Sequence, residues 1–290
     1  MITISHPEKV LFPDDGITKG ELASYYEAIA PIMLPHITGR PVTMERFHRG
    51  ISEEGFFQKS VPKGPEWLER VEVPKKGGTV HHPLVNDTRS LLWLANQNCI
   101  TPHVWASRVP RLQFPDVCVF DLDPARDEPG PLREAALALR DLLSELGLAS
   151  WVKTSGSKGF HIVTPLDGKS NAGEVAAFSH AVGTVLVARH PRTLTLEFSK
   201  EDREGRIYVD TGRNHPPATF AAAYAVRARP TAPVSAPCTW ADVEGGKVSP
   251  TTFTLRNMSE RVSAVGDLWS GMYVEAHSLK TAIAALKHET

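Results

Sequence analysis

Apolar positions along the chain follow two spacings, and these predict an alternation of helices and strands. Residues 22–33 have helical spacing behind a capping box at 18–21, and we expect Pro31 and Pro35 to mark the end of that helix. Residues 62–78 contain three prolines and three glycines and are predicted to be irregular surface.

The middle of the chain has the clearest pattern, with short apolar runs separated by amphipathic stretches. Pro131 is suitably placed to begin a helix, Asn171 is suitably placed to cap one, and Asp87 or Thr88 is suitably placed to cap another. The pattern predicts helices at 88–97, 131–147 and 171–186, and strands at 41–44, 116–123, 150–154, 160–164, 194–198, 206–210 and 219–226. This mixture predicts an α+β fold with a central mixed or antiparallel sheet flanked by helices.

Composition narrows the class of protein. The chain has 290 residues, of which 41% are hydrophobic and 22% charged, as in a globular protein with its own core. Lys and Arg total 32 against 33 Asp and Glu, so the formal net charge is −1. That balance argues against a protein that coats nucleic acid through a broad basic surface, but it allows a local phosphate-binding pocket.

The cysteines and the N-terminus indicate the compartment. Cys99, Cys118 and Cys238 form no C-x-x-C pair, which suggests a reducing environment. The N-terminus lacks the basic start and apolar run of a signal peptide, and no stretch approaches the ~20 apolar residues of a membrane span. We expect a cytoplasmic protein with no membrane partner.

Two acidic residues end the strand predicted at 116–123. Asp121 and Asp123 are two residues apart, so they point to the same face of the strand, and Pro124 follows them as a strand breaker. Neighbouring carboxylates repel one another unless a cation lies between them, and Mg²⁺ or Mn²⁺ takes oxygen ligands of this kind. The alternative for a lone D-x-D is a solvated strand end.

A polar loop at 155–159, with the sequence SGSKG, lies between two predicted strands. It offers two hydroxyls, an ammonium and backbone N–H groups, with two glycines that allow close approach of a ligand, and His161 begins the next strand. These groups suit a phosphate, although a plain polar hairpin loop would have the same composition.

A third acidic residue, Asp210, ends the strand predicted at 206–210. A single aspartate there is usually a turn former, but beside Asp121 and Asp123 it would complete a carboxylate cluster for two metal ions, of the kind that supports phosphoryl transfer. Arginines at 203, 206, 213, 227 and 229 could neutralise phosphate charge if they lie near such ions.

Together these motifs resemble the polymerase domain of bacterial ligase D, a non-homologous end-joining domain of the archaeo-eukaryotic primase superfamily. The matching segments are PEKVLFP (7–13), GFFQK (55–59), LLWLANQNCITPHVW (91–105), VFDLDP (119–124), KTSGSKGFHIVTPL (153–166), REGRIYVD (203–210) and YAVRARPTAPVSAPCTW (224–240). The resemblance implies a single domain over 1–290, with an N-terminal helical and loop part at 1–100, a catalytic core at 101–270 and a C-terminal helix at 271–290.

The resemblance implies a template-directed nucleotidyltransferase that extends 3′-hydroxyl primers at gaps and broken DNA ends and prefers ribonucleoside triphosphates. Asp121, Asp123 and Asp210 would be the catalytic ligands of two Mn²⁺ or Mg²⁺ ions. The nucleotide-binding residues that it implies are Arg46, Phe56, Phe57, His103, Ser155, Gly156, Ser157, Lys158, His161, Arg203 and Arg227. An exposed phenylalanine ring can stack on any base, although two adjacent phenylalanines are more often core residues.

The resemblance also implies that His6, Lys9 and Lys19 bind the 5′-phosphate of a DNA end, whose charge exceeds that of a backbone diester. Implied partners are DNA with gaps or 3′ overhangs, nucleoside triphosphates, Ku, a separately encoded ligase and a second copy of the chain across a break, at the nucleoid. His6 stands where the family often has Asn, Glu45 where some relatives have Lys, and Arg213 where Gln is frequent. No ligase or nuclease signature follows, so we expect a stand-alone polymerase or an excised domain.

Three other functions remain as alternatives. A primase–polymerase of the same superfamily would start chains without a primer. A metal-dependent glycosyltransferase also uses D-x-D, but Asp210 and the 155–159 loop count against it. A silent DNA-end-binding module would have no need of all three aspartates.

Overall fold

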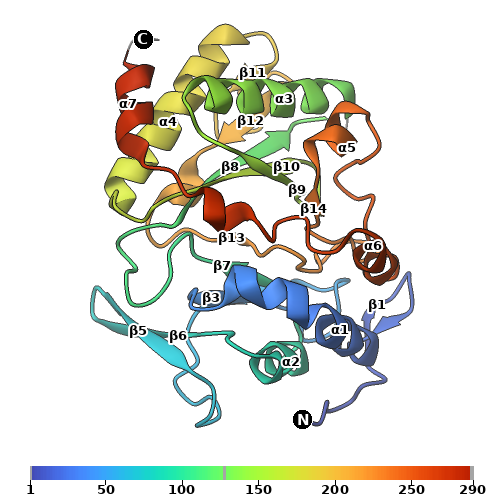
Figure 1. Cartoon of the computed structure of the whole chain (residues 1–290). Helices are drawn as coiled ribbons and strands as arrows, with labels where there is room; N and C mark the ends of the chain where they lie inside the picture. Colours follow the sequence, from blue (N-terminus) through green and yellow to red (C-terminus); the bar gives the residue numbers. More distant parts are fainter. Residues whose placement is uncertain (1, 127–128, 288–290) are drawn as a thin grey trace. The chain divides into compact units, whose positions relative to one another are not determined.

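The chain folds into two compact units, each assembled from separate stretches of sequence. The computed structural model describes residues 2–126 and 129–287. Unit 1 comprises Met1–Pro110, Thr219–Ala236 and Phe253–Asp267, and unit 2 comprises Arg111–Ala218, Pro237–Thr252 and Leu268–Thr290. Both units mix helices with strands, so the predicted α+β class is confirmed (Figure 1).

Unit 2 is built on a six-stranded sheet in the order β11–β12–β8–β10–β9–β14. Its strands are β8 (Val117–Pro124), β9 (Trp151–Thr154), β10 (Phe160–Pro165), β11 (Leu194–Thr195), β12 (Ile207–Asp210) and β14 (Pro237–Cys238). The sheet is mixed, because β11 and β12 run parallel while the other neighbours run antiparallel. This is the central mixed sheet that the sequence predicts.

Helices cover the sheet of unit 2. Two long helices, α3 (Pro129–Glu145) and α4 (Ala172–Arg189), pack against β8 and against each other (Figure 1). The predicted cap is confirmed, because the Asn171 side chain accepts a hydrogen bond from the backbone N–H of Glu174. In return, the backbone N–H of Asn171 donates to the Glu174 carboxylate. The remaining helical elements of unit 2 are η1 (Gly212–Asn214), α5 (Trp240–Glu244), η2 (Met272–Glu275) and α7 (Leu279–Leu286).

The C-terminal helix is shorter than the sequence suggests. Within the range 271–290, the structure has the 3-10 turn η2 followed by α7, and residues 288–290 lie outside the described part of the chain. Leu279, Ala282 and Leu286 are the buried residues of α7, and their helical spacing gives α7 one apolar side.

Unit 1 contains a four-stranded sheet in the order β13–β7–β3–β4, together with two separate hairpins. Its strands are β1 (Val10–Phe12), β2 (Ile17–Thr18), β3 (Val42–Arg46), β4 (Phe56–Gln58), β5 (Arg70–Lys75), β6 (Gly78–Pro83), β7 (Cys99–Val104) and β13 (Phe220–Ala221). Its helices are α1 (Lys19–Ile37), α2 (Thr88–Asn96) and α6 (Met258–Val265). Both predicted caps are present, with Thr18 on α1 and Asp87 on α2.

Helix α1 continues through both prolines, so the prediction that Pro31 and Pro35 end it is wrong. The two prolines lie four residues apart and are both exposed. The carbonyl groups that lose their helical partners therefore face water, while the buried face with Tyr26, Ile29 and Met33 holds the helix in place.

The segment at 62–78 is also more regular than predicted, because it contains β5 and the start of the β5–β6 hairpin. Lys76 and Gly77 form the turn, where Gly77 has φ of 78°, and Gly78, with φ of 154°, begins β6. The glycines that suggested irregular surface thus connect two strands.

Two predicted strands are shorter than expected. At 194–198 only the first two residues form β11, because the Thr195 hydroxyl accepts from the Glu197 backbone N–H at 3.1 Å and turns the chain. At 219–226 the strand stops after Ala221, where a turn precedes Tyr224 with φ of 65°.

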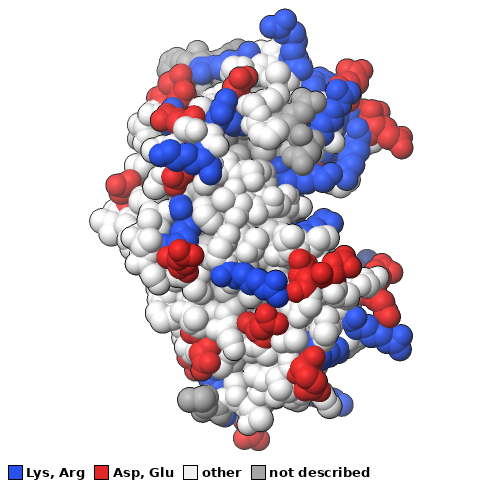
Figure 2. All heavy atoms as spheres, turned by 90° about the vertical axis from the view of Figure 1, so that its right-hand side faces the viewer, with Lys and Arg blue, Asp and Glu red and all other residues white. Residues whose placement is uncertain are grey.

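One face of the molecule carries side chains of both charges. On the face drawn in Figure 2, basic and acidic side chains intermingle and are separated by uncharged surface. Among the described residues, no helix combines the length and the apolar character needed to span a membrane.

Candidate active site

Four charged or titratable side chains form a row across neighbouring strands of the unit 2 sheet. Lys153 on β9 pairs with His161 on β10, His161 pairs with Asp121 on β8, and Asp121 pairs with Asp210 on β12. Residues directly opposite one another on neighbouring strands share a face of the sheet. We call this set, together with Asp123, the acidic row.

The two aspartates of the D-x-D motif lie on one face, as predicted. Leu122 between them is fully buried, whereas Asp121 and Asp123 are partly accessible. Asp210 is directly opposite Asp121 in the register of β12 and β8. The structure therefore brings together all three carboxylates that the sequence picks out.

Arg213 lies against two of these carboxylates. Its Nε and Nη2 atoms are 3.2 Å and 3.1 Å from Asp121 Oδ2, and its Nε is 3.1 Å from Asp210 Oδ2. Burial raises the pKa of Asp121, and the charge of Arg213 opposes that rise while those of Asp210 and Asp123 add to it. Three acids this close need a compensating cation.

Backbone contacts fix the segment that carries Asp210 and Arg213. The Gly212 N–H donates to Asp210 Oδ1 at 2.8 Å. The Asn214 side chain accepts from the Val119 N–H at 2.8 Å and donates to the Val119 carbonyl at 2.7 Å, which ties the segment to β8. These bonds hold the Asp210 strand end against the D-x-D strand.

Asp123 has a different cation. Its Oδ2 accepts from Arg203 Nη1 at 2.9 Å, and the Arg203 side chain is 4% exposed. The same guanidinium donates to the carbonyls of Glu197 and Phe198, and it lies 4.7 Å from the ring centre of Tyr208. Arg203 is thus a buried anchor for Asp123, and its predicted contact with nucleotide stays a prediction.

His161 is buried inside the acidic row and does not extend from the loop. The Lys153 ammonium donates to His161 Nδ1 at 2.8 Å, so Nδ1 acts as an acceptor and Nε2 carries the hydrogen. His161 Nε2 is 3.5 Å from Asp121 Oδ1. The fully buried Lys153 therefore sets the imidazole tautomer that faces Asp121.

The predicted phosphate loop, residues 155–159, is closed by Ser155. Its hydroxyl oxygen accepts from the backbone N–H groups of Ser157 and Gly159 at 3.1 Å and 3.0 Å. Gly156 has φ of 63°, Ser157 is half-buried and Lys158 is exposed at the tip. Ser155 is a structural part of this loop, and its contact with a nucleotide stays a prediction.

Gly159 connects the loop to the acidic row. A Cβ atom at this position would lie 1.6 Å from the carbonyl oxygen of Leu122, between the two aspartates. Only glycine lets the loop lie this close to β8. The loop and the D-x-D motif are therefore positioned by one another.

The chemistry of the acidic row fits divalent metal ions, and its carboxylates also contact the guanidinium groups of Arg203 and Arg213. Three carboxylates are the hard oxygen donors that Mg²⁺ and Mn²⁺ prefer. Within residues 2–126 and 129–287, no three His, Cys, Asp or Glu side chains are disposed as a ready metal site.

A second group of predicted residues lies on the four-stranded sheet of unit 1. Phe57 is 57% exposed and packs its ring edge on His103 with ring centres 5.3 Å apart. His103 Nε2 lies 3.1 Å from Glu45 Oε2. An exposed ring is available for stacking, so the core-packing alternative for Phe57 does not hold.

Phe56 and Arg46 face one another on β4 and β3. The Arg46 guanidinium lies 5.4 Å from the Phe56 ring centre and donates to the carbonyl of Gln97 at 2.7 Å and to the side chain of Gln58. Phe56 is also partly exposed. Arg227, on the loop after β13, acts electrostatically on Glu45.

The three residues predicted to bind a 5′-phosphate lie around the start of α1. Lys19 is buried, and its ammonium donates to the carbonyl and hydroxyl of Ser5 at 2.7 Å and 3.2 Å. The Lys9 ammonium donates to the carbonyl of His48. Burial lowers the pKa of Lys19, and the nearby charge of Lys9 lowers it further. His6 is exposed and lies 3.5 Å from Glu8.

Comparison with known proteins agrees with this geometry. A family model described as LigD, primase-polymerase domain, matches residues 18–269. The chain belongs to the LigD primase-polymerase domain family. It is therefore an enzyme of the nucleotidyltransferase class, of polymerase type.

Curated LigD proteins are similar over nearly the whole chain. The multifunctional non-homologous end joining protein LigD of Mycolicibacterium smegmatis is 34% identical over 284 residues, which cover 95% of this chain and 36% of the relative. The bifunctional LigD of Bacillus subtilis is 28% identical over 262 residues, or 89% of this chain and 42% of that protein. The chain thus spans well under half the length of these relatives.

A solved structure matches the fold. The polymerase domain of Mycobacterium tuberculosis ligase D in complex with DNA superposes with a TM-score of 0.89 at 32% sequence identity. The match covers 96% of this chain and 99% of that domain. It agrees with the LigD primase-polymerase assignment over the full fold.

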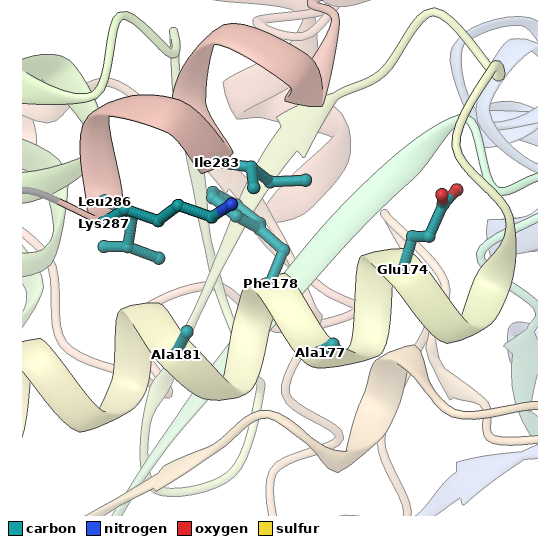
Figure 3. A pocket seen from close by; sticks show the side chains of 7 residues that line it. All are labelled: Glu174, Ala177, Phe178, Ala181, Ile283, Leu286 and Lys287. Atoms are coloured by element: carbon teal, nitrogen blue, oxygen red, sulfur yellow. The ribbon is translucent and has the colours of Figure 1, made fainter.

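Unit 2 also has an apolar pocket of about 320 Å³ between α4 and α7 (Figure 3). Apolar side chains such as Phe178, Ile283 and Leu286 line it, with Glu174 and Lys287 as its charged members. None of the residues that the LigD primase-polymerase resemblance implies lines this pocket. The acidic row is therefore identified as the candidate active site by its carboxylates and not by the shape of a pocket.

The sequence did not predict three of the contacts in these sites. It did not predict that Lys153 would orient His161, that Glu45 would pair with His103, or that Arg213 would bridge Asp121 and Asp210. Lys153 follows Val152, and His161 lies between Phe160 and Ile162 on the adjacent strand, and these polar residues within apolar runs were the available signal. The contact of Glu45 depends on the register of β3 with β7, which the sequence does not specify.

Proposed function

We propose that this chain is a template-directed nucleotidyltransferase that extends 3′-hydroxyl primers at gaps and broken DNA ends during non-homologous end joining. The observation that carries the proposal is the acidic row, with Asp121, Asp123 and Asp210 on one face of the sheet beside a polar loop. The names of the relatives, which concern end joining, and the DNA in the solved relative support this substrate class.

The three aspartates are the proposed ligands of two divalent cations, Mn²⁺ or Mg²⁺. When bound, such ions would acidify the attacking hydroxyl and neutralise the triphosphate. His161 would hold Asp121 in its orientation through Nε2, and Lys153 would hold His161.

The loop at 155–159 is the proposed binding site for the triphosphate. Lys158 is exposed at its tip and supplies a positive charge, and the half-buried Ser157 supplies a hydroxyl. Ser155 and Gly159 keep the loop beside β8. Gly156 has the left-handed φ of 63°, and the N–H groups of Ser157 and Gly159 donate to Ser155, so the side chains of Ser157 and Lys158 are the proposed phosphate contacts.

The family resemblance assigns Phe56, Phe57, Arg46, His103 and Arg227 to the nucleotide or template. The exposed ring of Phe57 suits stacking on any base. Preference for ribonucleoside triphosphates rests on the resemblance alone, and competition between the two nucleotide types tests it.

The resemblance further assigns His6, Lys9 and Lys19 to a 5′-phosphate. Two lysines near the first turn of α1 support this, because a terminal phosphate carries more charge than a diester. Ku, a separate ligase and a second copy across the break are the proposed partners at the nucleoid.

Primer extension on a gapped duplex tests the proposal. We expect Asp121→Asn and Asp210→Asn to reduce nucleotide addition by at least about a thousandfold, because each removes a charge from the phosphoryl-transfer centre. DNA binding, measured by fluorescence anisotropy, should remain within about twofold. Asp141→Asn, on the exposed side of α3, is the matched control.

Undiminished addition by either variant would contradict the assignment. Omission of the primer in the same assay distinguishes a primer-extending polymerase from a primase–polymerase of the same superfamily. Products that start without a primer would instead support a primase–polymerase.

A further inference from the structure

Two cationic side chains approach the acidic row, and they are held in different ways. Arg203 is 4% exposed and also bonds two backbone carbonyls, so it is locked beside Asp123. Arg213 is 40% exposed, and its guanidinium pairs with the carboxylates of Asp121 and Asp210. Arg213 is therefore the cation that can leave.

Arg213 lies between two of the three carboxylates, those of Asp121 and Asp210. One guanidinium spans Asp121 Oδ2 and Asp210 Oδ2, with three N–O distances of 3.1–3.2 Å. Two carboxylates that share one cation are the arrangement that a divalent ion would replace. The guanidinium lies between the two Oδ2 atoms, where a metal ion that bridges the same pair of carboxylates would bind.

We propose that Arg213 is a built-in counter-ion of the acidic row, which divalent cations must displace when they bind. This inference rests on the proposed function, because it takes the three aspartates as metal ligands. In the metal-free protein the guanidinium limits the repulsion between Asp121 and Asp210. Arg213 thereby weakens metal binding and stabilises the metal-free fold.

Displacement gives the guanidinium a new role. Arg213 follows Asp210 in the short turn η1, so its side chain remains near the row after it leaves the carboxylates. The planar guanidinium binds phosphate oxygens through paired N–H groups. The released Arg213 is therefore placed to bind an anionic group of the incoming nucleotide, which couples metal binding to nucleotide binding.

Titration calorimetry with Mn²⁺ and the full chain, without nucleotide or DNA, tests the inference. We expect Arg213→Gln to bind Mn²⁺ about tenfold more tightly than the wild type, because removal of a partly buried ion pair ends the competition. Arg140→Gln is the control, since the Arg140 guanidinium pairs with the carboxylates of Asp141 and Glu244 and not with the acidic row. Its Mn²⁺ affinity should equal that of the wild type.

The outcomes distinguish this inference from the proposed function. Equal affinity of wild type and Arg213→Gln, with binding lost in Asp121→Asn, would overturn the counter-ion role and leave the metal site standing. Absence of Mn²⁺ binding in both proteins would overturn both. Binding by Arg213→Gln alone would support the counter-ion role.

A second measurement uses the wild-type chain, in case the variant does not fold. The Arg213 Nε–H signal in a ¹H–¹⁵N spectrum should exchange slowly with solvent in the metal-free protein, since Nε donates to Asp121. Addition of Mg²⁺ should shift this signal and speed its exchange at least about tenfold. A signal that Mg²⁺ leaves unchanged while it shifts neighbours in β8 would contradict displacement.

Discussion

Each carboxylate of the acidic row has a cationic or polar neighbour that fixes its orientation. Arg203 holds Asp123, Arg213 bridges Asp121 and Asp210, and His161 lies beside Asp121. In a low-dielectric setting such contacts decide which oxygen atoms face the reaction. The residues that flank the three aspartates are therefore as informative as the aspartates.

Lys153 offers a test of this orientation. Lys153→Met keeps the length of the buried side chain but removes the donor to His161 Nδ1, so the imidazole can change its tautomer. We expect nucleotide addition to fall by about ten- to a hundredfold in single-turnover assays. Thermal denaturation should change little, because removal of a buried ammonium offsets the lost hydrogen bond.

Lys169→Met is the matched control, since Lys169 is an exposed lysine of unit 2. Its nucleotide addition should equal that of the wild type. Wild-type addition by Lys153→Met would show that His161 needs no fixed tautomer.

Glu45 predicts a pH dependence of stability. Burial opposes its ionisation, but the hydrogen bond and charge of His103 and the charge of Arg227 lower its pKa below the ordinary 4.5. A lowered pKa adds stability above the ordinary value, and that stability is lost as the pH falls through the folded-state pKa. The wild type should therefore be more stable than Glu45→Gln at pH 7.

Urea unfolding across pH measures this difference. We expect Glu45→Gln to lose about 1 kcal/mol at pH 7, and the two proteins to converge as the pH falls below 4.5. A gap that widens toward acid would mean that Glu45 is neutral in the folded protein.

At the scale of elements, local sequence signals predicted most helices and the central strands. Thr18, Asp87 and Asn171 cap helices where their spacing suggested. The helix that continues past Pro31 and Pro35 was not predictable, because packing of its buried face outweighs the two lost hydrogen bonds. Local pattern cannot weigh those tertiary contacts.

Because the phosphate loop lies against β8 at Gly159, adding a single methyl group there should change both stability and activity. Gly159→Ala would place a Cβ 1.6 Å from the Leu122 carbonyl oxygen, so the loop must move away from the D-x-D strand. We expect a loss of about 3 kcal/mol in unfolding free energy and at least about a hundredfold in nucleotide addition.

Gly130→Ala is the control for this change. Gly130 lies in α3 with nothing within 4 Å of an added Cβ, so alanine should leave stability equal or slightly higher. Chemical denaturation and primer extension on both variants measure the contrast. Equal behaviour of the two variants would mean that the loop tolerates displacement.

At the scale of the whole molecule, the formal net charge of −1 is consistent with the mixed charges on the face in Figure 2. Affinity for DNA would then depend on a few local contacts. The motifs predicted the three carboxylates, because their strand positions are local features. The pairing of Arg203 with Asp123 and of Arg213 with Asp121 was not predicted, because these contacts join residues that are 80 and 92 positions apart in the chain.

Recognition of a DNA end would depend on two local positive charges, those of Lys9 and Lys19. If Lys9 and Lys19 bind a terminal phosphate, Lys9→Ala with Lys19→Ala should weaken binding to gapped DNA with a 5′-phosphate by about tenfold or more. Binding to the same DNA with a 5′-hydroxyl should change less than about twofold. Anisotropy titrations at one fixed salt concentration compare the two, and equal losses would refute end recognition.

The central claim is that the acidic row is the nucleotidyl-transfer centre, and anomalous scattering at the manganese edge tests it most directly. In crystals grown with Mn²⁺ and a non-hydrolysable nucleoside triphosphate, we predict anomalous peaks bounded by Asp121, Asp123 and Asp210, with the triphosphate beside the loop at 155–159. Manganese or triphosphate bound elsewhere, with the acidic row still closed by Arg213, would contradict the account.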